Sequence, residues 1–163
     1  MSLFMQQEMD FEIVYNKYAD MLYRLALSHM LHKEDAEDVV HDVFVKYMYG
    51  LHLPMDEAHE KAWFIRVTVN QCCDALRKKK YRMHDSLDDV QEIAKFENPE
   101  LQDLMAALQK LPPKYRSIVD LHYLEGYSVE EVGKIMGLSA SAVKMRLKRS
   151  RGFLKEELEE ESK

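Results

Sequence analysis

Apolar residues recur at helical spacing along almost the whole chain. In the first half, two such stripes predict helices over about residues 10–30 and 34–49. The second of these begins with acidic residues, which a helix N-terminus favours, and stops at Gly50. Asp56 then stands where an N-cap is expected, and the pattern after it predicts a third helix to about Lys80. The first half therefore predicts three amphipathic helices.

The periodicity is lost over residues 83–97, which are acidic and predict a linker. Asn98, followed directly by proline, then has the form of a helix start. Several short apolar stripes follow it. Ser128, with a glutamate three positions later, predicts a capping box, and Ser139 can cap the last helix, which continues to about residue 160. The second half therefore predicts a series of shorter helices.

The fold class expected from these patterns is all-α. The chain has 163 residues, enough for two small domains, and only 5 Gly and 4 Pro, a poor supply of turns for a sandwich or barrel. We expect a helical domain over 1–82 and a second over 98–163, joined by the acidic linker 83–97.

Charge is distributed unevenly. The whole chain has a formal net charge of −6, which by itself argues against a nucleic-acid partner. However, residues 61–82 have a net charge of +6 and residues 134–155 of +7, so the remainder has −19. One basic run is often a solvated helix face. Two basic runs in two predicted domains favour a long anionic polymer as the partner.

Other classes of protein find little support. No apolar run approaches the roughly 20 residues of a membrane span, and the first residues lack the pattern of a signal peptide, so we expect a cytoplasmic protein without membrane insertion. The adjacent Cys72 and Cys73 are too few for a disulfide framework or a zinc site. No P-loop or dinucleotide fingerprint is present, and we expect no cofactor.

The second basic run has the organisation of a helix-turn-helix, because a glycine-containing turn joins two predicted helices. On the last helix, one face would carry hydroxyl, cationic and thioether groups toward a major groove: Ser141, Lys144, Met145 and Lys148. Flanking arginines would bind phosphates: Arg146, Arg149 and Arg151. The alternative reading is an ordinary helical hairpin with a basic exterior.

The first basic run combines aromatic and cationic residues. Trp63 precedes the cations Arg77, Lys78, Lys79 and Lys80 on one predicted helix. Aromatic rings can stack on unpaired bases while cations hold the backbone, which is typical of single-strand binding. A tryptophan beside a basic helix is more often part of a core, and this second interpretation stays open.

These residues resemble a known family. The stretch DAEDVVHDVF (35–44), followed by WFIRVTVN (63–70), is similar to the promoter-melting domain of bacterial sigma factors. LPPKYRSIVDLHYLEGYSVEEVGKIMGLSASAVKMRLKRSRGFL (111–154) is similar to their C-terminal helix-turn-helix domain. The short layout of two domains resembles the extracytoplasmic-function (ECF) group, and the resemblance covers nearly the whole chain.

The resemblance implies three functional surfaces. The first would dock on the clamp of core RNA polymerase through Asp35, Asp38, His41, Asp42 and Phe44. Where the family usually has Gln-Glu, this chain has His41-Asp42. The second would melt the −10 promoter element and hold a flipped base through Trp63, Arg66, Asn70 and the loop Gly50–Pro54. The third would read the −35 element through Ser139, Ser141, Lys144, Arg146, Lys148 and Arg149.

The resemblance also implies partners. Core polymerase and promoter DNA are expected, and an anti-sigma factor that clamps both domains would suit the apolar stripes and 11 methionines. The free chain is expected to be a monomer. The acidic linker would lie near the polymerase active site, where its charge mimics nucleic acid.

Two alternatives differ in class. A two-domain helix-turn-helix regulator would read DNA without engaging polymerase, but the acidic helix at 35–44 disfavours it. A di-metal helical-bundle enzyme would use carboxylate–histidine pairs such as Asp38 with His41 and Asp56 with His59. Such bundles also need carboxylates from two further helices, so we expect a protein that is not an enzyme.

Overall fold

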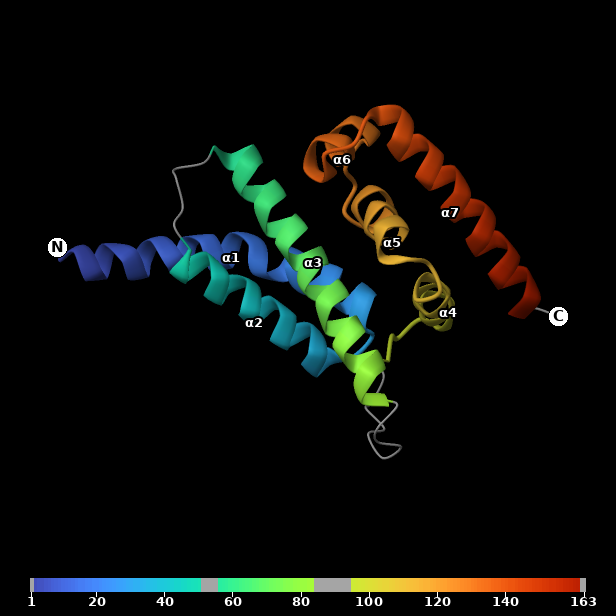
Figure 1. Ribbon diagram of the computed structural model, residues 1–163, viewed down its shortest axis with the longest axis horizontal. Helices are drawn as coiled ribbons and strands as arrows, with labels where there is room; N and C mark the ends of the chain where they lie inside the picture. Colours follow the sequence, from blue (N-terminus) through green and yellow to red (C-terminus); the bar gives the residue numbers. More distant parts are fainter. Residues whose placement is uncertain (1, 51–55, 84–94, 162–163) are drawn as a thin grey trace.

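The chain folds into helices, as its periodicity predicts (Figure 1). The computed structural model describes residues 2–50, 56–83 and 95–161. Within these ranges there is no strand, which confirms the all-α prediction. The helices are α1 (Leu3–Met30), α2 (Lys33–Tyr49), α3 (Glu57–Met83), α4 (Pro99–Leu108), α5 (Pro113–Val119), the π-helical turn η1 (Asp120–Leu124), α6 (Val129–Met136) and α7 (Ala140–Glu161). No helix in the described part is long and apolar enough to cross a membrane.

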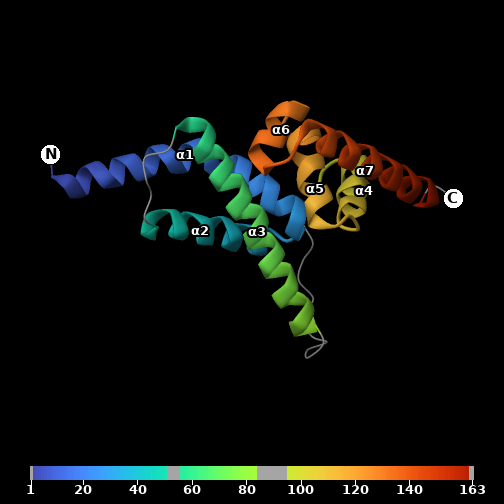
Figure 2. The same cartoon turned by 45° about the horizontal axis from the view of Figure 1, so that its top comes forward.

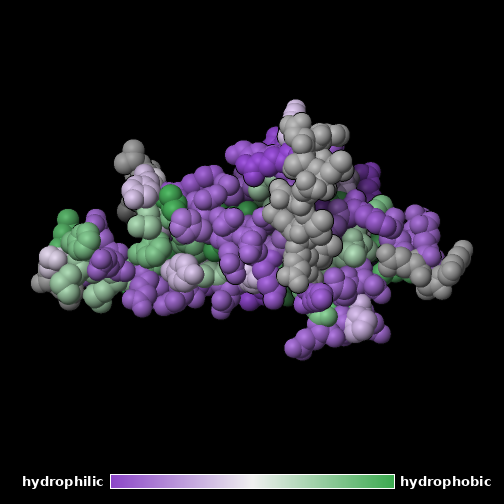
Figure 3. Space-filling model, turned by 90° about the horizontal axis from the view of Figure 1, so that it is seen from below, coloured by the Kyte–Doolittle hydropathy of each residue, from purple (hydrophilic) through white to green (hydrophobic). Residues whose placement is uncertain are grey.

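The first helix is longer than its apolar stripe predicts. It begins at Leu3, where the Ser2 hydroxyl accepts a hydrogen bond from the Met5 N–H, instead of near residue 10. Its first turns extend beyond the body of the protein, and Leu3 and Phe4 are 79% and 68% exposed. Figure 3 shows apolar surface at the end of the molecule that α1 forms. No buried stripe runs through these first turns, so the hydrophobic pattern does not predict them as helix.

Aromatic rings hold α1, α2 and α3 together. Phe64 is fully buried on α3, and rings from α1, α2 and α3 surround it. The ring centroids of Tyr18, Phe44, Tyr47 and Trp63 lie 4.7, 5.3, 5.0 and 5.0 Å from that of Phe64. Aromatic pairs at this separation stabilise a core beyond the area they bury. The cluster fixes how α2 and α3 are presented to solvent.

Side-chain caps set the helix starts in the second half, as predicted. Asn98 accepts a hydrogen bond from the backbone of Glu100, and Ser128 forms a capping box with Glu131. The hydroxyl of Ser139 accepts from the Ala142 N–H at the start of α7. Each cap satisfies an N–H group that would otherwise lack a partner at a helix end.

The N-terminal helices α1–α3 and the C-terminal helices α4–α7 pack on each other, and their buried side chains form one continuous core (Figure 2). Helix α6 lies on α3, and α5 contacts both α1 and α3. The predicted linker 83–97 falls almost entirely outside the described residues. Of its last residues, Phe96 packs against the core and its N–H donates to the Gln102 side chain.

Candidate nucleic-acid and protein interfaces

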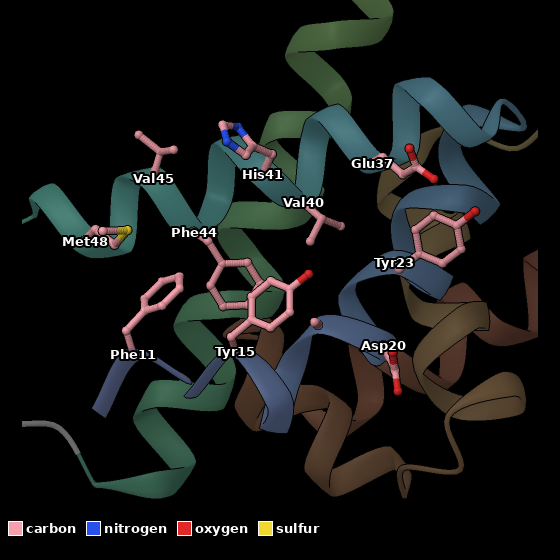
Figure 4. A pocket seen from close by; sticks show the side chains of 11 residues that line it. Phe11, Tyr15, Asp20, Tyr23, Glu37, Val40, His41, Phe44, Val45 and Met48 are labelled. Carbon is pink, nitrogen blue, oxygen red and sulfur yellow. The ribbon is translucent and has the colours of Figure 1, made fainter. Parts of the chain in front are cut away.

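A groove of about 600 Å³ lies between α1 and α2 (Figure 4). Its floor is aromatic: the rings of Phe11 and Tyr15 lie 6.0 and 4.9 Å from that of Phe44. Polar side chains that include Asp20 and Glu37 stand among its lining residues. Nonpolar surface with an acidic border is suited to a partner helix that is itself apolar with basic flanks.

The residues predicted to dock on polymerase lie around this groove in different ways. Asp38, His41 and Asp42 are exposed on α2, and His41 lines the groove. Phe44 is only 4% exposed and forms part of the groove floor, so most of its ring is core. Asp42 accepts a hydrogen bond from the Gln71 amide on α3 at 3.3 Å. Asp38 and Asp42 do not line the groove, and they form an exposed acidic face of α2 beside it.

Asp35 has a different environment from the other predicted docking residues. Its carboxylate accepts a hydrogen bond from Lys79 Nζ at 3.1 Å, and both side chains are largely covered, at 20% and 28% exposed. Lys79 was expected to bind nucleic acid. In this structure the two side chains bind each other and join α2 to α3.

The candidate single-strand surface lies on α3. Trp63 is half-buried in the aromatic cluster, so its ring is mostly structural, whereas Asn70 is exposed one to two turns further along. Lys78 and Lys80 are exposed, and Arg77 bonds the Asp74 carboxylate of its own helix at 2.5 Å. Of the loop that precedes α3, Gly50 is an extended residue at the end of α2, and Pro54 lies outside the described residues.

Arg66 is placed differently from what its expected role requires. Its guanidinium Nε donates a hydrogen bond to the carbonyl oxygen of Ile135, at the end of α6. Gly137, in the turn that follows, lies so close that a Cβ there would meet the Arg66 guanidinium at 2.9 Å. The side chain predicted to face the −10 element is therefore held against the C-terminal helices.

The predicted helix-turn-helix is present as α6, a short turn and α7. Gly137 ends α6 in the left-handed conformation, with φ of +69°, which favours glycine. The turn packs closely on α6, since a Cβ on Gly133 would meet the Leu138 carbonyl oxygen at 2.6 Å. Val143 and Leu147, four positions apart, are buried on the inner face of α7.

The outer face of α7 carries the side chains predicted to contact DNA. Exposed there are Ser141, Lys144, Met145, Lys148, Arg149 and Arg151. Arg146 is half-buried, and the Ser139 hydroxyl accepts the capping hydrogen bond of α7. The helix thus presents a broad cationic surface with few acidic neighbours before Glu156. This surface fits the width of a major groove and the phosphates beside it.

Two tyrosines that sequence reasoning missed position arginines of α7. Arg149 Nη1 donates to the Tyr115 hydroxyl at 3.5 Å, and Arg151 Nη1 donates to that of Tyr123 at 2.8 Å. The hydrogen bond and positive charge of Arg149 lower the pKa of Tyr115. Both tyrosines lie in the helical segment before α6, and no sequence spacing relates them to α7. Held arginines lose less conformational entropy when they bind phosphate.

Asp56 and His59, one of the carboxylate–histidine pairs considered for a di-metal enzyme, lie at the start of α3. The Asp56 carboxylate caps α3 by accepting from the His59 N–H at 2.8 Å, and the same oxygen lies 2.8 Å from His59 Nδ1. Within the described ranges, no three His, Cys, Asp or Glu side chains come together as a metal site would require. The Asp56 and His59 pair is a helix cap on an exposed surface.

Comparison with known proteins gives matches over both halves. Residues 14–82 match the Sigma-70 region 2 family, and residues 101–154 match Sigma-70, region 4. The chain is 31% identical to RNA polymerase sigma factor SigV of Bacillus subtilis, over 85% of each chain. It is 32% identical to ECF RNA polymerase sigma factor SigE of Mycolicibacterium smegmatis over 90% of its own length, but spans only 60% of that protein.

Solved structures of sigma factors have the same fold as this chain. The sigma factor RpoE of Bartonella quintana, in complex with the anti-sigma factor NepR, superposes with a TM-score of 0.70 at 25% identity, over 92% of this chain and 97% of that one. The fold is also that of CnrH, solved with the cytosolic domain of CnrY, with a TM-score of 0.64 at 24% identity, over 93% and 89% of the two chains. The chain therefore belongs to the RNA polymerase sigma factors of the ECF group, the initiation factors that direct RNA polymerase to promoters.

Proposed function

We propose that this sigma factor divides its work among three surfaces, and that the groove between α1 and α2 binds core polymerase. The aromatic floor would bury apolar side chains of the polymerase clamp, while His41 at the border and Asp38 and Asp42 on the adjacent exposed face of α2 would meet basic groups. Apolar anchors at the centre of an interface contribute most of its affinity, and border charges mainly steer association. Asp35 would reach polymerase only by releasing Lys79.

For the −10 element, the proposed surface is the exposed part of α3. Asn70 would hydrogen-bond an extruded base, and the cations Arg77, Lys78 and Lys80 would hold the backbone of the separated strand. Extrusion costs a few kcal/mol per base, which stacking and hydrogen bonds must offset. Arg66 would take part after it leaves the carbonyl of Ile135. Gly50 and Pro54 belong to the loop that would contribute the rest of the base pocket.

For the −35 element, the proposed surface is the outer face of α7. Lys144, Lys148 and Ser141 would face base edges, while Arg146, Arg149 and Arg151 would bind phosphates. The observation that carries the whole proposal is this exposed cationic helix face after a helix-turn-helix, on the same chain as an acidic apolar groove. A DNA-binding regulator that does not engage polymerase would not need the groove. Membership of the sigma factor family favours neither that regulator nor a di-metal enzyme.

The remaining expectations follow from the family. The complex of RpoE with NepR supports an anti-sigma factor as a partner of this chain, for which the apolar groove between α1 and α2 is a suitable surface. We infer that the chain acts in the cytoplasm beside polymerase, as a monomer when free. It is proposed to open DNA by binding energy, without catalysing a reaction of its own.

Run-off transcription with core polymerase on genomic fragments tests the function directly, since a promoter-specific transcript must depend on this chain. Charge reversal by Asp38→Lys should abolish the complex with core on a native gel while leaving duplex binding intact. The matched control is Glu12→Lys, which reverses an exposed charge on α1 instead of on the acidic face of α2. Equal loss of the complex in both variants, or no specific transcript with the parent chain, would refute the proposal.

A further inference from the structure

This inference rests on the proposed function. Under that function, the contact between the N-terminal and C-terminal helices prevents the chain from binding its promoter elements. Arg66 cannot contact the −10 element while it bonds the Ile135 carbonyl of α6. The α3 and α7 surfaces must also reach two separate promoter elements. The closed arrangement in the structure therefore has to open, and the chemistry of the contact decides what opens it.

The centre of the contact is a buried carboxyl group. Asp120, the first residue of η1, is 1% exposed and faces the end of α1. The Ser28 hydroxyl donates to its Oδ1 at 2.9 Å, and among the described residues its Oδ2 has no hydrogen-bond partner. His29 Nδ1 lies 3.8 Å from Oδ2, beyond hydrogen-bond distance, and its N–H donates to the Leu25 carbonyl instead.

The other charged groups around Asp120 form their hydrogen bonds and ion pairs with other residues. From α5, which directly precedes η1, Arg116 directs its N–H groups to four carbonyl oxygens, including those of Leu108 and Leu111. From α1, Arg24 pairs with Glu125 at 2.8 Å, next to Asp120 at the same junction. From α3, the buried Cys72 faces Asp120, and its thiol is neutral because burial raises its pKa to about 12. An ionised Asp120 would therefore have one full hydrogen bond and no direct ion pair in the described structure.

We propose that Asp120 is a proton-dependent latch between the two groups of helices: the neutral carboxyl closes the contact, and the ionised carboxylate favours its opening. A neutral carboxyl tolerates this burial with one hydrogen bond, whereas a carboxylate needs several donors or water. Opening gives the carboxylate that water. It also frees Arg66 and lets α7 move relative to α3.

The pKa values of Asp120 and of its neighbour His29 agree with this role for the buried carboxyl. Burial raises the pKa of Asp120 to about 7, against the smaller opposing effects of the Ser28 hydrogen bond and the Arg116 charge. Burial lowers the pKa of His29 to about 4, so this ring is neutral near pH 7 and provides no counter-charge. In the open form the pKa of Asp120 would return toward its ordinary value of 3.8.

The two pKa values of Asp120, in the closed and open forms, determine whether a rise in pH favours the closed or the open chain. Because the closed form has the higher pKa, closing takes up a proton between about pH 4 and pH 7. The ratio of closed to open chain therefore falls as the pH rises through this window, by up to about tenfold per pH unit, and levels off above pH 7. Between pH 6.2 and 8.0 the expected fall is about sevenfold.

Single-molecule fluorescence transfer on the full chain measures this ratio without polymerase or DNA. Dyes are placed on Glu12→Cys and Lys155→Cys, two exposed positions on α1 and α7, in a Cys73→Ser background. The parent should show the sevenfold fall from pH 6.2 to 8.0. Asp120→Asn, which mimics the neutral carboxyl, should stay closed at both pH values. Asp103→Asn, an exposed carboxyl on α4, is the matched control and should behave as the parent.

A pH-independent ratio in the parent, or an equal fall in Asp120→Asn, would overturn the latch. If Asp120→Asn does not fold by circular dichroism, Ser28→Ala decides instead. Loss of its hydrogen bond should move the midpoint of the parent's transition to higher pH, and an unmoved midpoint overturns the proposal. Because the measurement uses only the free chain, a pH-dependent ratio together with absent run-off transcription would refute the proposed function and keep the latch.

Discussion

Replacing Arg116 with methionine should destabilise the protein more than any other single arginine substitution on the described helices. Arg116 is 3% exposed, and its N–H groups reach the carbonyl oxygens of Leu108 and Leu111 at 2.8 and 2.7 Å, Gln109 at 2.9 Å and His29 at 3.3 Å. These bonds tie α5 to the end of α4 and to the end of α1. Methionine fills similar space but donates no hydrogen bond.

The magnitude follows from which carbonyls lose their donor. Leu108 keeps a hydrogen bond from the Leu111 N–H at 3.1 Å, so the loss falls mainly on the carbonyls of the buried residues Leu111 and His29. Each unpaired buried carbonyl costs about 1–3 kcal/mol. Removal of the buried guanidinium recovers part of its desolvation free energy. The expected loss is therefore about 3 kcal/mol, out of a total of about 5–15 kcal/mol for a domain. For a urea m-value of about 2 kcal/mol/M, the midpoint falls by about 1.5 M.

Urea unfolding followed by circular dichroism measures this loss. Arg82→Met, an exposed arginine near the end of α3, is the control and should change the unfolding free energy by less than about 0.5 kcal/mol. If Arg116→Met cost no more than Arg82→Met, the carbonyl hydrogen bonds would not support the contact between the two groups of helices, and the reasoning from burial would be refuted.

Three further predictions concern the surfaces. Lys148→Ala should weaken −35 duplex binding and reduce the slope of log affinity against log salt by about one, whereas Lys155→Ala at the end of α7 should leave the slope unchanged; the measurement is a salt titration by fluorescence anisotropy. Asn70→Ala should reduce permanganate reactivity of the −10 strand in the polymerase complex without changing binding to core, and full reactivity would contradict the role given to Asn70. Iodoacetamide should modify Cys73 at least about tenfold faster than Cys72 at pH 8, because burial raises the pKa of the Cys72 thiol to about 12 and leaves little thiolate; equal rates by mass spectrometry would contradict the burial.

Helices, caps and the position of the helix-turn-helix could be predicted because they depend on local spacing. The capping box at Ser128 and the buried face of α7 follow directly from residues three or four positions apart. The first turns of α1 could not, since they bury nothing and thus have no periodic signal. The role of Asp120 was also hidden, although an acid within the apolar run Ile118–Leu121 is a signal worth testing. Its partners on α1 come from tertiary packing alone.

The same distinction bears on what holds the closed form together. The ion pair that crosses the contact, Arg24 of α1 with Glu125, at 2.8 Å, leaves the Arg24 side chain 58% exposed, and pairs near the surface are typically worth about 0–1 kcal/mol and weaken with salt. The bridge from Asp35 to Lys79 is more covered, but it joins α2 to α3 and leaves the C-terminal helices free to move. The hydrogen bonds that cross the contact from Arg116 to the His29 carbonyl and from Ser28 to Asp120 are buried, so salt affects them far less. High salt should therefore weaken promoter binding well before it opens the closed chain, and the two effects can be separated in one titration.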